Sequence, residues 1–289
     1  MEDFTRGLTR RRFLAAASAV PLATMAVRAA GRQSAVPVGL ELYSVRTELA
    51  DDLPGTVATV AKMGYQVVEF YSPYLQWSNR LAGQVRQQLD DLGISCPSTH
   101  NPASALAGDP LQRAIELNEI LGSRMIVAAS PPPKLTTASA WQAFADTCAA
   151  AAEALAPLGM RAGFHNHAAE WREVDGRRPM DILAAGTPDQ FVLQLDVGTA
   201  VEAGADPVAW IEAHPGRIRS MHCKDWGAGE GRGYSVAFGD GDAPWAAIFE
   251  AAERVGGIEH YYIEQEVSPP GGQFAMAERC LGNYKRLRG

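Results

Sequence analysis

Short apolar runs alternate with longer amphipathic stretches along most of this chain, and this alternation constrains the fold more than any other feature. The runs recur about every thirty residues and are separated by Ala-rich segments with helical periodicity. We expect strands at 38–43, 66–70, 94–100, 124–128, 161–166, 191–196, 217–222 and 260–265. We expect helices at 53–63, 79–92, 109–121, 138–157, 180–185, 206–214, 244–255 and 273–287. Eight β/α units in roughly 250 residues predict an α/β fold, a (β/α)8 TIM barrel in a single domain.

The turn after the first expected strand argues against the other common parallel α/β fold. A doubly wound sheet usually places a glycine-rich phosphate loop there. Residues 42–46 read Leu-Tyr-Ser-Val-Arg, with neither a G-x-G-x-x-G nor a Walker motif. The glycine-rich stretch at 227–233 follows the seventh expected strand and lacks the Lys-Ser/Thr ending of a P-loop, so we interpret it as a loop at the barrel mouth.

The first 35 residues differ from the rest and are predicted to be an export signal. The sequence T-R-R-R-F-L at 9–14 precedes an uncharged run at 13–27, shorter than the roughly 20 residues of a membrane-spanning helix. The paired arginines resemble a twin-arginine signal; a Sec signal or a basic tail is the alternative. We expect residues 1–35 to be read by the twin-arginine export machinery, and residues 36–289 to form a periplasmic or extracellular barrel without a membrane span.

Charge and cysteine content exclude two classes of function. Lys and Arg total 26 against 33 Asp and Glu, a formal net charge of -7. Because an acidic chain repels phosphate backbones, a general nucleic-acid binder is not expected. The chain has 4 cysteines and no C-x-x-C motif, so neither a zinc knuckle nor a thioredoxin-like redox site is expected.

Ionisable side chains gather at the carboxyl ends of the expected strands, where a TIM barrel carries its chemistry. Residues two apart share a face of a strand, whereas Cys223 points the other way and is expected to pack. Imidazoles and carboxylates without thiolates suit Mn2+, Zn2+, Co2+ or Fe2+ better than Ca2+. For any single histidine, a hydrogen-bonded structural role is the alternative. The residues concerned are His100, His165, His167, Glu170, Asp196, His222, Lys224, Glu264 and Glu266.

Six segments, taken in order, carry a family resemblance. They are G-L-E-L-Y-S-V-R at 39–46, G-F-H-N-H-A-A-E-W at 163–171, L-D-V-G-T-A at 195–200 with A-G-A-D-P at 203–207, H-C-K-D at 222–225, F-G-D-G at 238–241 with Trp245, and I-E-Q-E at 263–266. Together they resemble the xylose isomerase-like barrel superfamily, the sugar (phosphate) isomerases and epimerases. The resemblance covers essentially all of the chain after residue 35.

The resemblance implies a divalent metal ion at the barrel mouth, bound by Asp196, His222 and Glu264. The fourth ligand of the family is usually a strand-five glutamate, and here that position is His165. Glu41 stands where the family's first-strand motif has Gln. In epimerases of the superfamily, glutamates on strands five and eight act as paired acid and base. A metal-bound imidazole has one nitrogen occupied, so His165 cannot simply replace that glutamate.

The residues suit metal-assisted chemistry beside a carbonyl, and the resemblance implies an isomerase or epimerase that acts on a sugar or keto-sugar through an enolate or enediolate. The alternatives are a lyase or hydratase that eliminates a β-substituent from a 3-keto-glycoside or inosose, and a non-catalytic periplasmic sugar-binding barrel. Export and the lack of an evident phosphate cluster favour an unphosphorylated carbohydrate. A homo-oligomer is left open. Candidate catalytic side chains are His167, Glu170 and Lys224, and candidate substrate contacts are Arg46, His100, Trp171 and Glu266.

Overall fold

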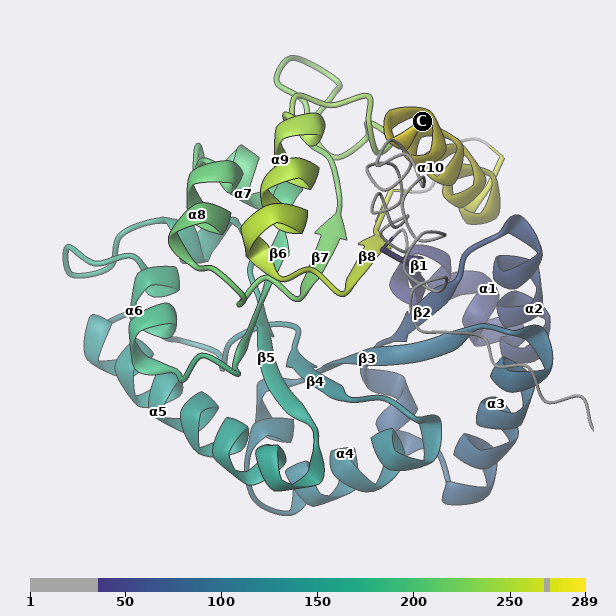
Figure 1. The fold of residues 1–289 in the computed structure, drawn as a ribbon, viewed down its shortest axis with the longest axis horizontal. Coiled ribbons are helices and arrows are strands. Elements are labelled where there is room, and N and C mark those ends of the chain that lie inside the picture. The colour runs from purple at the N-terminus through teal and green to yellow at the C-terminus, as the bar shows by residue number, and fades with distance from the viewer. Residues whose placement is uncertain (1–35, 268–270) are drawn as a thin grey trace, which may run out of the picture. The chain divides into compact units, whose positions relative to one another are not determined.

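The structure, a computed structural model, describes residues 36–267 and 271–289. Each strand in this part of the chain pairs in parallel with the next, and the last pairs with the first, so the sheet closes into a barrel. Figure 1 shows the strands at the centre with the helices around them, which confirms the predicted (β/α)8 fold. The strands are β1 (Val38–Glu41), β2 (Val67–Phe70), β3 (Ser95–Asn101), β4 (Met125–Ala128), β5 (Arg161–His165), β6 (Val192–Asp196), β7 (Ser220–Cys223) and β8 (His260–Ile263).

The helices fall between the strands, as the alternation predicts. Helices α2 and α3 end at Gly64 and Gly93, whose φ angles of 102° and 67° are left-handed and suit a residue without a Cβ. The helices are α1 (Arg46–Asp51), α2 (Leu53–Met63), α3 (Asn79–Leu92), α4 (Gly108–Leu121), α5 (Ala138–Leu155), α6 (Pro179–Gly186), α7 (Val197–Glu202), α8 (Pro207–Ala213), α9 (Trp245–Ala251) and α10 (Gln273–Arg288). Shorter turns are η1 (Leu42–Val45), η2 (Ser72–Gln76), η3 (Ala103–Leu106), η4 (Ala156–Leu158), η5 (Ala168–Trp171) and η6 (Ala252–Gly256).

The two faces of each strand bury different chemistry. In β4, Ile126 and Ala128 join the large apolar core, whereas Met125 and Val127 join a separate small cluster with Val192 of β6. This two-residue alternation separates the layer between sheet and helices from the interior of the barrel. The same alternation places Cys223 in the large core, as its position in the sequence predicts.

Polar side chains fill the part of the barrel interior that lies toward the mouth. Glu69, Ser98, Gln194 and Ser220 come from four different strands, all 0% exposed, and hydrogen bonds connect them. Buried polar groups need such partners, because an unpaired group pays its full desolvation cost. A polar network therefore underlies the mouth of the barrel.

Three further observations concern the cysteines, the membrane and the N-terminus. Cys96, Cys148, Cys223 and Cys280 are buried free thiols. Within residues 36–267 and 271–289, no helix is long and apolar enough to cross a membrane. The predicted twin-arginine signal at residues 1–35 lies outside the described residues.

Candidate metal and substrate site

Four side chains meet at the mouth of the barrel, from β5, β6, β7 and the end of β8. They are His165, Asp196, His222 and Glu264, all buried, and each offers a ligand atom within 4.8 Å of the others. His165 Nε2 lies 3.7 Å from Asp196 Oδ2, and His222 Nδ1 lies 2.6 Å from Glu264 Oε2. The structure thus brings together the four residues that the sequence predicts as metal ligands.

The chemistry of this cluster fits a divalent ion. Asp196 Oδ1 accepts a hydrogen bond from Thr199 N at 2.8 Å, but Asp196 Oδ2 is buried without a hydrogen-bond partner. A buried carboxylate oxygen without a partner is costly unless a cation or a donor reaches it. Two imidazoles and two carboxylates form a donor set suited to Mn2+, Fe2+, Co2+ or Zn2+.

Hydrogen bonds from deeper in the barrel orient the two imidazoles. His165 Nδ1 donates to Gln194 Oε1 at 3.1 Å, since an amide oxygen can only accept. His222 Nε2 donates to Glu69 Oε2 at 2.6 Å. Each ring therefore turns its other nitrogen toward the cluster, the arrangement in which metal-binding histidines are typically held.

Glu69 of β2 supports this cluster and is a residue that the sequence analysis missed. Its carboxylate also accepts from Gln194 Nε2 at 3.1 Å and from Ser98 Oγ, and His100 Nε2 lies 3.4 Å away. Burial alone would raise the pKa of Glu69, but His100 and His222 outweigh it and lower that pKa to about 2. The carboxylate is therefore held ionised beneath the cluster.

His222 lies between two carboxylates. Burial would lower the pKa of this imidazole, but Glu69 and Glu264 outweigh burial and hold the pKa well above its usual value. A metal ion beside Nδ1 would take the place of a proton there, since both satisfy the same negative charge.

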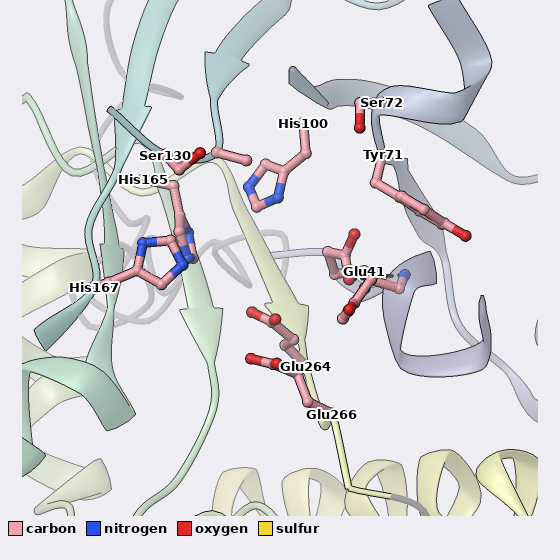
Figure 2. Close-up of a pocket in the computed structure, with 11 residues that line it drawn as sticks. Glu41, Tyr71, Ser72, His100, Ser130, His165, His167, Glu264 and Glu266 are labelled. Atoms are coloured by element: carbon pink, nitrogen blue, oxygen red, sulfur yellow. Dashed lines mark hydrogen bonds between the residues drawn. The ribbon is translucent and has the colours of Figure 1, made fainter. Parts of the chain in front are cut away.

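A cavity of about 290 Å³, the polar cavity, opens above the cluster. Figure 2 shows His100, His165 and His167 on one side of it and Glu41, Glu264 and Glu266 on the other. The lining residues are Glu41, Tyr43, Tyr71, Ser72, His100, Ala129, Ser130, His165, His167, Glu264 and Glu266.

Glu41, at the end of β1, lines this cavity and has one carboxylate oxygen without a hydrogen-bond partner. Its Oε2 accepts from Tyr43 N at 2.8 Å, while its Oε1 is buried without a hydrogen-bond partner. Burial, with Glu264 adding to it, raises the pKa of Glu41 well above the usual value. In the sequence, Glu41 stands out because it replaces the Gln of the family motif. That it lines the cavity is seen only in the structure.

Lys224 lies beside the cluster rather than in it. Its Nζ is 3.6 Å from Glu264 Oε1 and 3.8 Å from Asp196 Oδ2, and it also donates to Glu266. Burial would lower the pKa of Lys224, but these carboxylates outweigh burial and raise it. The ammonium is therefore fixed as a positive charge next to two of the candidate ligands.

Three of the predicted site residues are placed elsewhere. Trp171 is buried and packs edge-on against Trp210, with ring centroids 4.9 Å apart. Glu170 is also buried and accepts from His167 N at 2.6 Å, so it fixes the backbone at the start of η5. Arg46 donates to the backbone oxygens of Tyr43 and Glu266. None of the three lines the polar cavity, because each is held by local packing or backbone contacts.

The loop between β7 and α9 is organised by Asp225. Its carboxylate accepts from Gly239 N, Gly241 N and Trp245 Nε1 at 2.9, 3.1 and 2.8 Å. A Cβ at Gly241 would lie 2.1 Å from Asp225 Oδ1, which explains the glycine there. The ordered loop carries Tyr234, whose ring centre lies 5.1 Å from Lys224 Nζ.

Comparison with known proteins agrees with this fold. Residues 57–278 match the family described as xylose isomerase-like TIM barrel. A curated relative, the rhizopine catabolism protein MocC of Rhizobium meliloti, is 29% identical over 144 residues. That stretch spans 45% of this chain and 44% of the relative, less than half of either protein.

Two solved structures show how far the fold is shared. A sugar phosphate isomerase/epimerase from Parabacteroides distasonis superposes with a TM-score of 0.71 at 24% identity, over 89% of this chain and 96% of its own. The probable 3-DHS dehydratase AsbF of Bacillus anthracis superposes with a TM-score of 0.66 at 13% identity, over 86% and 98%. At these identities the likeness shows a fold that this chain shares with both proteins.

Proposed function

The chain belongs to the xylose isomerase-like TIM barrel family, and from that premise we propose that it is a divalent-metal-dependent enzyme that removes a proton beside a sugar carbonyl. The observation that carries this proposal is the buried cluster of His165, Asp196, His222 and Glu264, of which His165 and Glu264 line the polar cavity. When bound, a divalent ion there supplies Lewis-acid polarisation of a carbonyl or hydroxyl oxygen.

Glu41 is the base in this proposal. Its Oε1 lacks a hydrogen-bond partner and the residue lines the cavity, so we assign this oxygen to accept the proton from the carbon next to the carbonyl. In the family motifs this chain resembles, a strand-five glutamate has that task, and His165 stands in its place. A carboxylate on strand one thus compensates for the one absent from strand five.

Lys224 and the cavity histidines complete the chemistry. The ammonium of Lys224, beside the candidate ligands, stabilises negative charge that develops on the substrate oxygen. His100 and His167 lie across the cavity from Glu41 (Figure 2), and in this proposal they bind hydroxyl groups of the sugar. If the proton that Glu41 removes returns to the adjacent carbon, the reaction is an isomerisation; if His167 returns a proton on the opposite face, it is an epimerisation.

The second candidate is elimination of a β-substituent from the same enolate, by a lyase or hydratase acting on a 3-keto-glycoside or inosose. The replacement of the strand-five glutamate by His165 favours it, because elimination needs no second carboxylate to return a proton to carbon. The products separate the two candidates, since elimination releases the substituent and isomerisation does not.

An unphosphorylated substrate is part of the proposal. The 11 residues that line the polar cavity include three glutamates and neither Lys nor Arg, a poor environment for a phosphate dianion. Export by the twin-arginine route, the role we propose for residues 1–35, would also separate the enzyme from cytoplasmic sugar phosphates.

Replacing Arg10 and Arg11 by Lys tests the export signal. If the export machinery recognises this signal, the variant should stay in the cytoplasm.

The decisive experiment follows the proton. Purified full-length chain loaded with Mn2+ is incubated in D2O with a panel of ketoses and 3-keto-glycosides, and 1H NMR measures the signal of the C–H next to the carbonyl. We expect metal-dependent loss of that signal for at least one compound. Tight binding of a sugar without exchange or product would instead support a non-catalytic sugar-binding barrel.

A further inference from the structure

A second cavity, of about 720 Å³, opens on the β3–β4 side of the barrel mouth. Its walls are the segment after β3, the segment after β4 and the first turns of α5. None of its lining residues is charged. We call it the apolar cavity, and it is lined by Pro102, Ala103, Ser104, Ala107, Ser130, Pro131, Pro132, Pro133, Leu135, Ala140, Ala143, Phe144 and Thr147.

The apolar cavity adjoins the polar cavity at Ser130. This residue lines both, and Figure 2 shows it on the His100–His165 side of the polar cavity. The polar cavity alone, at about 290 Å³, lies at the lower end of the roughly 300–1,000 Å³ that small-molecule sites occupy. A ligand whose polar end lies at the metal cluster can therefore extend past Ser130 into the apolar cavity.

The walls of the apolar cavity are held in place by the chain itself. Pro131, Pro132 and Pro133 are consecutive, and a proline ring fixes its φ near about −65°. Phe144 is buried and packs edge-on against Phe164, with ring centroids 5.7 Å apart. Because these groups need little ordering on binding, an apolar ligand group gains most of its burial energy.

We propose that the apolar cavity is a subsite for an aromatic or other apolar group attached to the sugar, such as the aglycone of a glycoside. This inference rests on the proposed function in one respect, that the sugar end of the ligand lies in the polar cavity. A charged appendage would be desolvated without a partner, since the walls carry no charge. The shared wall at Ser130 favours a part of the same ligand over a second copy of the chain.

The test compares two sugar probes that differ only in the appended group. Isothermal titration of the Mn2+-loaded full-length chain measures Kd for the methyl and phenyl 3-keto-β-D-glucosides. We expect the phenyl probe to bind at least tenfold more tightly, because burial of an aromatic ring is strongly favourable.

Two variants fill the apolar cavity from different elements, Ala143→Trp on α5 and Ser104→Trp on η3. Each should reduce the phenyl advantage to less than twofold. The matched control is Ala150→Trp, an exposed position on the same helix that does not line the cavity, and it should keep the advantage. Circular dichroism and thermal melting check the fold of each variant.

Three results would overturn the inference: equal affinity for the two probes, no binding of either, or a phenyl advantage that survives in both filled variants. Dissociation of a dimer by these variants, seen by light scattering without a change in sugar affinity, would also overturn it by showing an interface between copies. A different result would contradict the proposed function alone. A phenyl advantage that the filled variants abolish, without any C–H exchange, would leave the subsite standing and contradict the proton chemistry.

Discussion

Two buried glutamates on neighbouring strands, Glu41 and Glu69, differ in how many hydrogen bonds their carboxylates accept. They lie opposite each other in the β1–β2 register and are 1% and 0% exposed. Both oxygens of the Glu69 carboxylate accept hydrogen bonds, whereas Glu41 keeps one oxygen unpaired. Burial alone therefore does not distinguish a carboxylate that positions other groups from one that can accept a proton. The number of hydrogen-bond donors around the carboxylate distinguishes the two.

The pKa directions follow from this difference. Imidazoles beside Glu69 overcome the effect of burial and lower its pKa, while Glu41 has burial and Glu264 acting in the same direction and its pKa rises. Glu69 is held as a fixed negative charge under His222. Glu41 is the carboxylate that we propose as the base.

Replacing the unpaired carboxylate should have the largest effect on activity. Glu41→Gln keeps the shape of the side chain and restores the amide of the family motif, but removes the proposed base. We expect kcat to fall by about 10²–10⁴-fold, with metal content and melting temperature nearly unchanged. Steady-state kinetics with metal analysis checks this. Full activity in this variant would contradict the assignment of Glu41.

Replacing Glu69, whose carboxylate oxygens both accept hydrogen bonds, should lower the affinity for the metal ion. In Glu69→Gln, one acceptor oxygen becomes an NH2 donor that faces other donors, so His222 loses part of its support. We expect the affinity for Mn2+ to fall by about 10–100-fold, as when other groups that orient metal ligands are lost. Calorimetric titration measures it, with exposed Glu212→Gln as the control. Unchanged affinity would mean that the contact to His222 does not matter for metal binding.

Asp225 is a second carboxylate that accepts several hydrogen bonds, but it contacts none of the candidate metal ligands. Replacing it tests whether such a carboxylate affects metal affinity without that contact. Asp225→Asn should weaken the loop after β7 and lower the free energy of unfolding by about 1–3 kcal/mol, because buried N–H groups lose an acceptor. Chemical denaturation and limited proteolysis within 227–243 report this change. Metal affinity should stay within about twofold of the unsubstituted chain, since the effect is confined to the loop. A loss as large as that in Glu69→Gln would remove the contrast between the two sites.

Local sequence pattern predicted most of the fold, since parallel strands buried on both faces are short apolar runs and helices ended at identifiable glycines. Helices α2 and α3 have the predicted bounds because Gly64 and Gly93 stop them. Helices α1 and α7 were missed, since six residues are too few for helical periodicity to be read.

The site was predictable where its residues lie at strand ends and not where they depend on distant partners. Asp196 and His222 follow from position in the barrel. Glu69 interrupts the apolar strand V-V-E-F, a visible signal, but its partners come from strands far away in the sequence. The packing of Trp171 against Trp210 likewise depends on tertiary contacts that no local pattern contains.

The most direct test of the central claim is the metal content of the purified full-length chain after equilibration with Mn2+ or Zn2+ and dialysis, measured by inductively coupled plasma mass spectrometry. The cluster at the mouth predicts one tightly held ion per chain, lost in Asp196→Ala and retained in Glu41→Gln. Absence of a stoichiometric ion in the unsubstituted chain, or full retention in Asp196→Ala, would contradict the assignment of this cluster as the metal site.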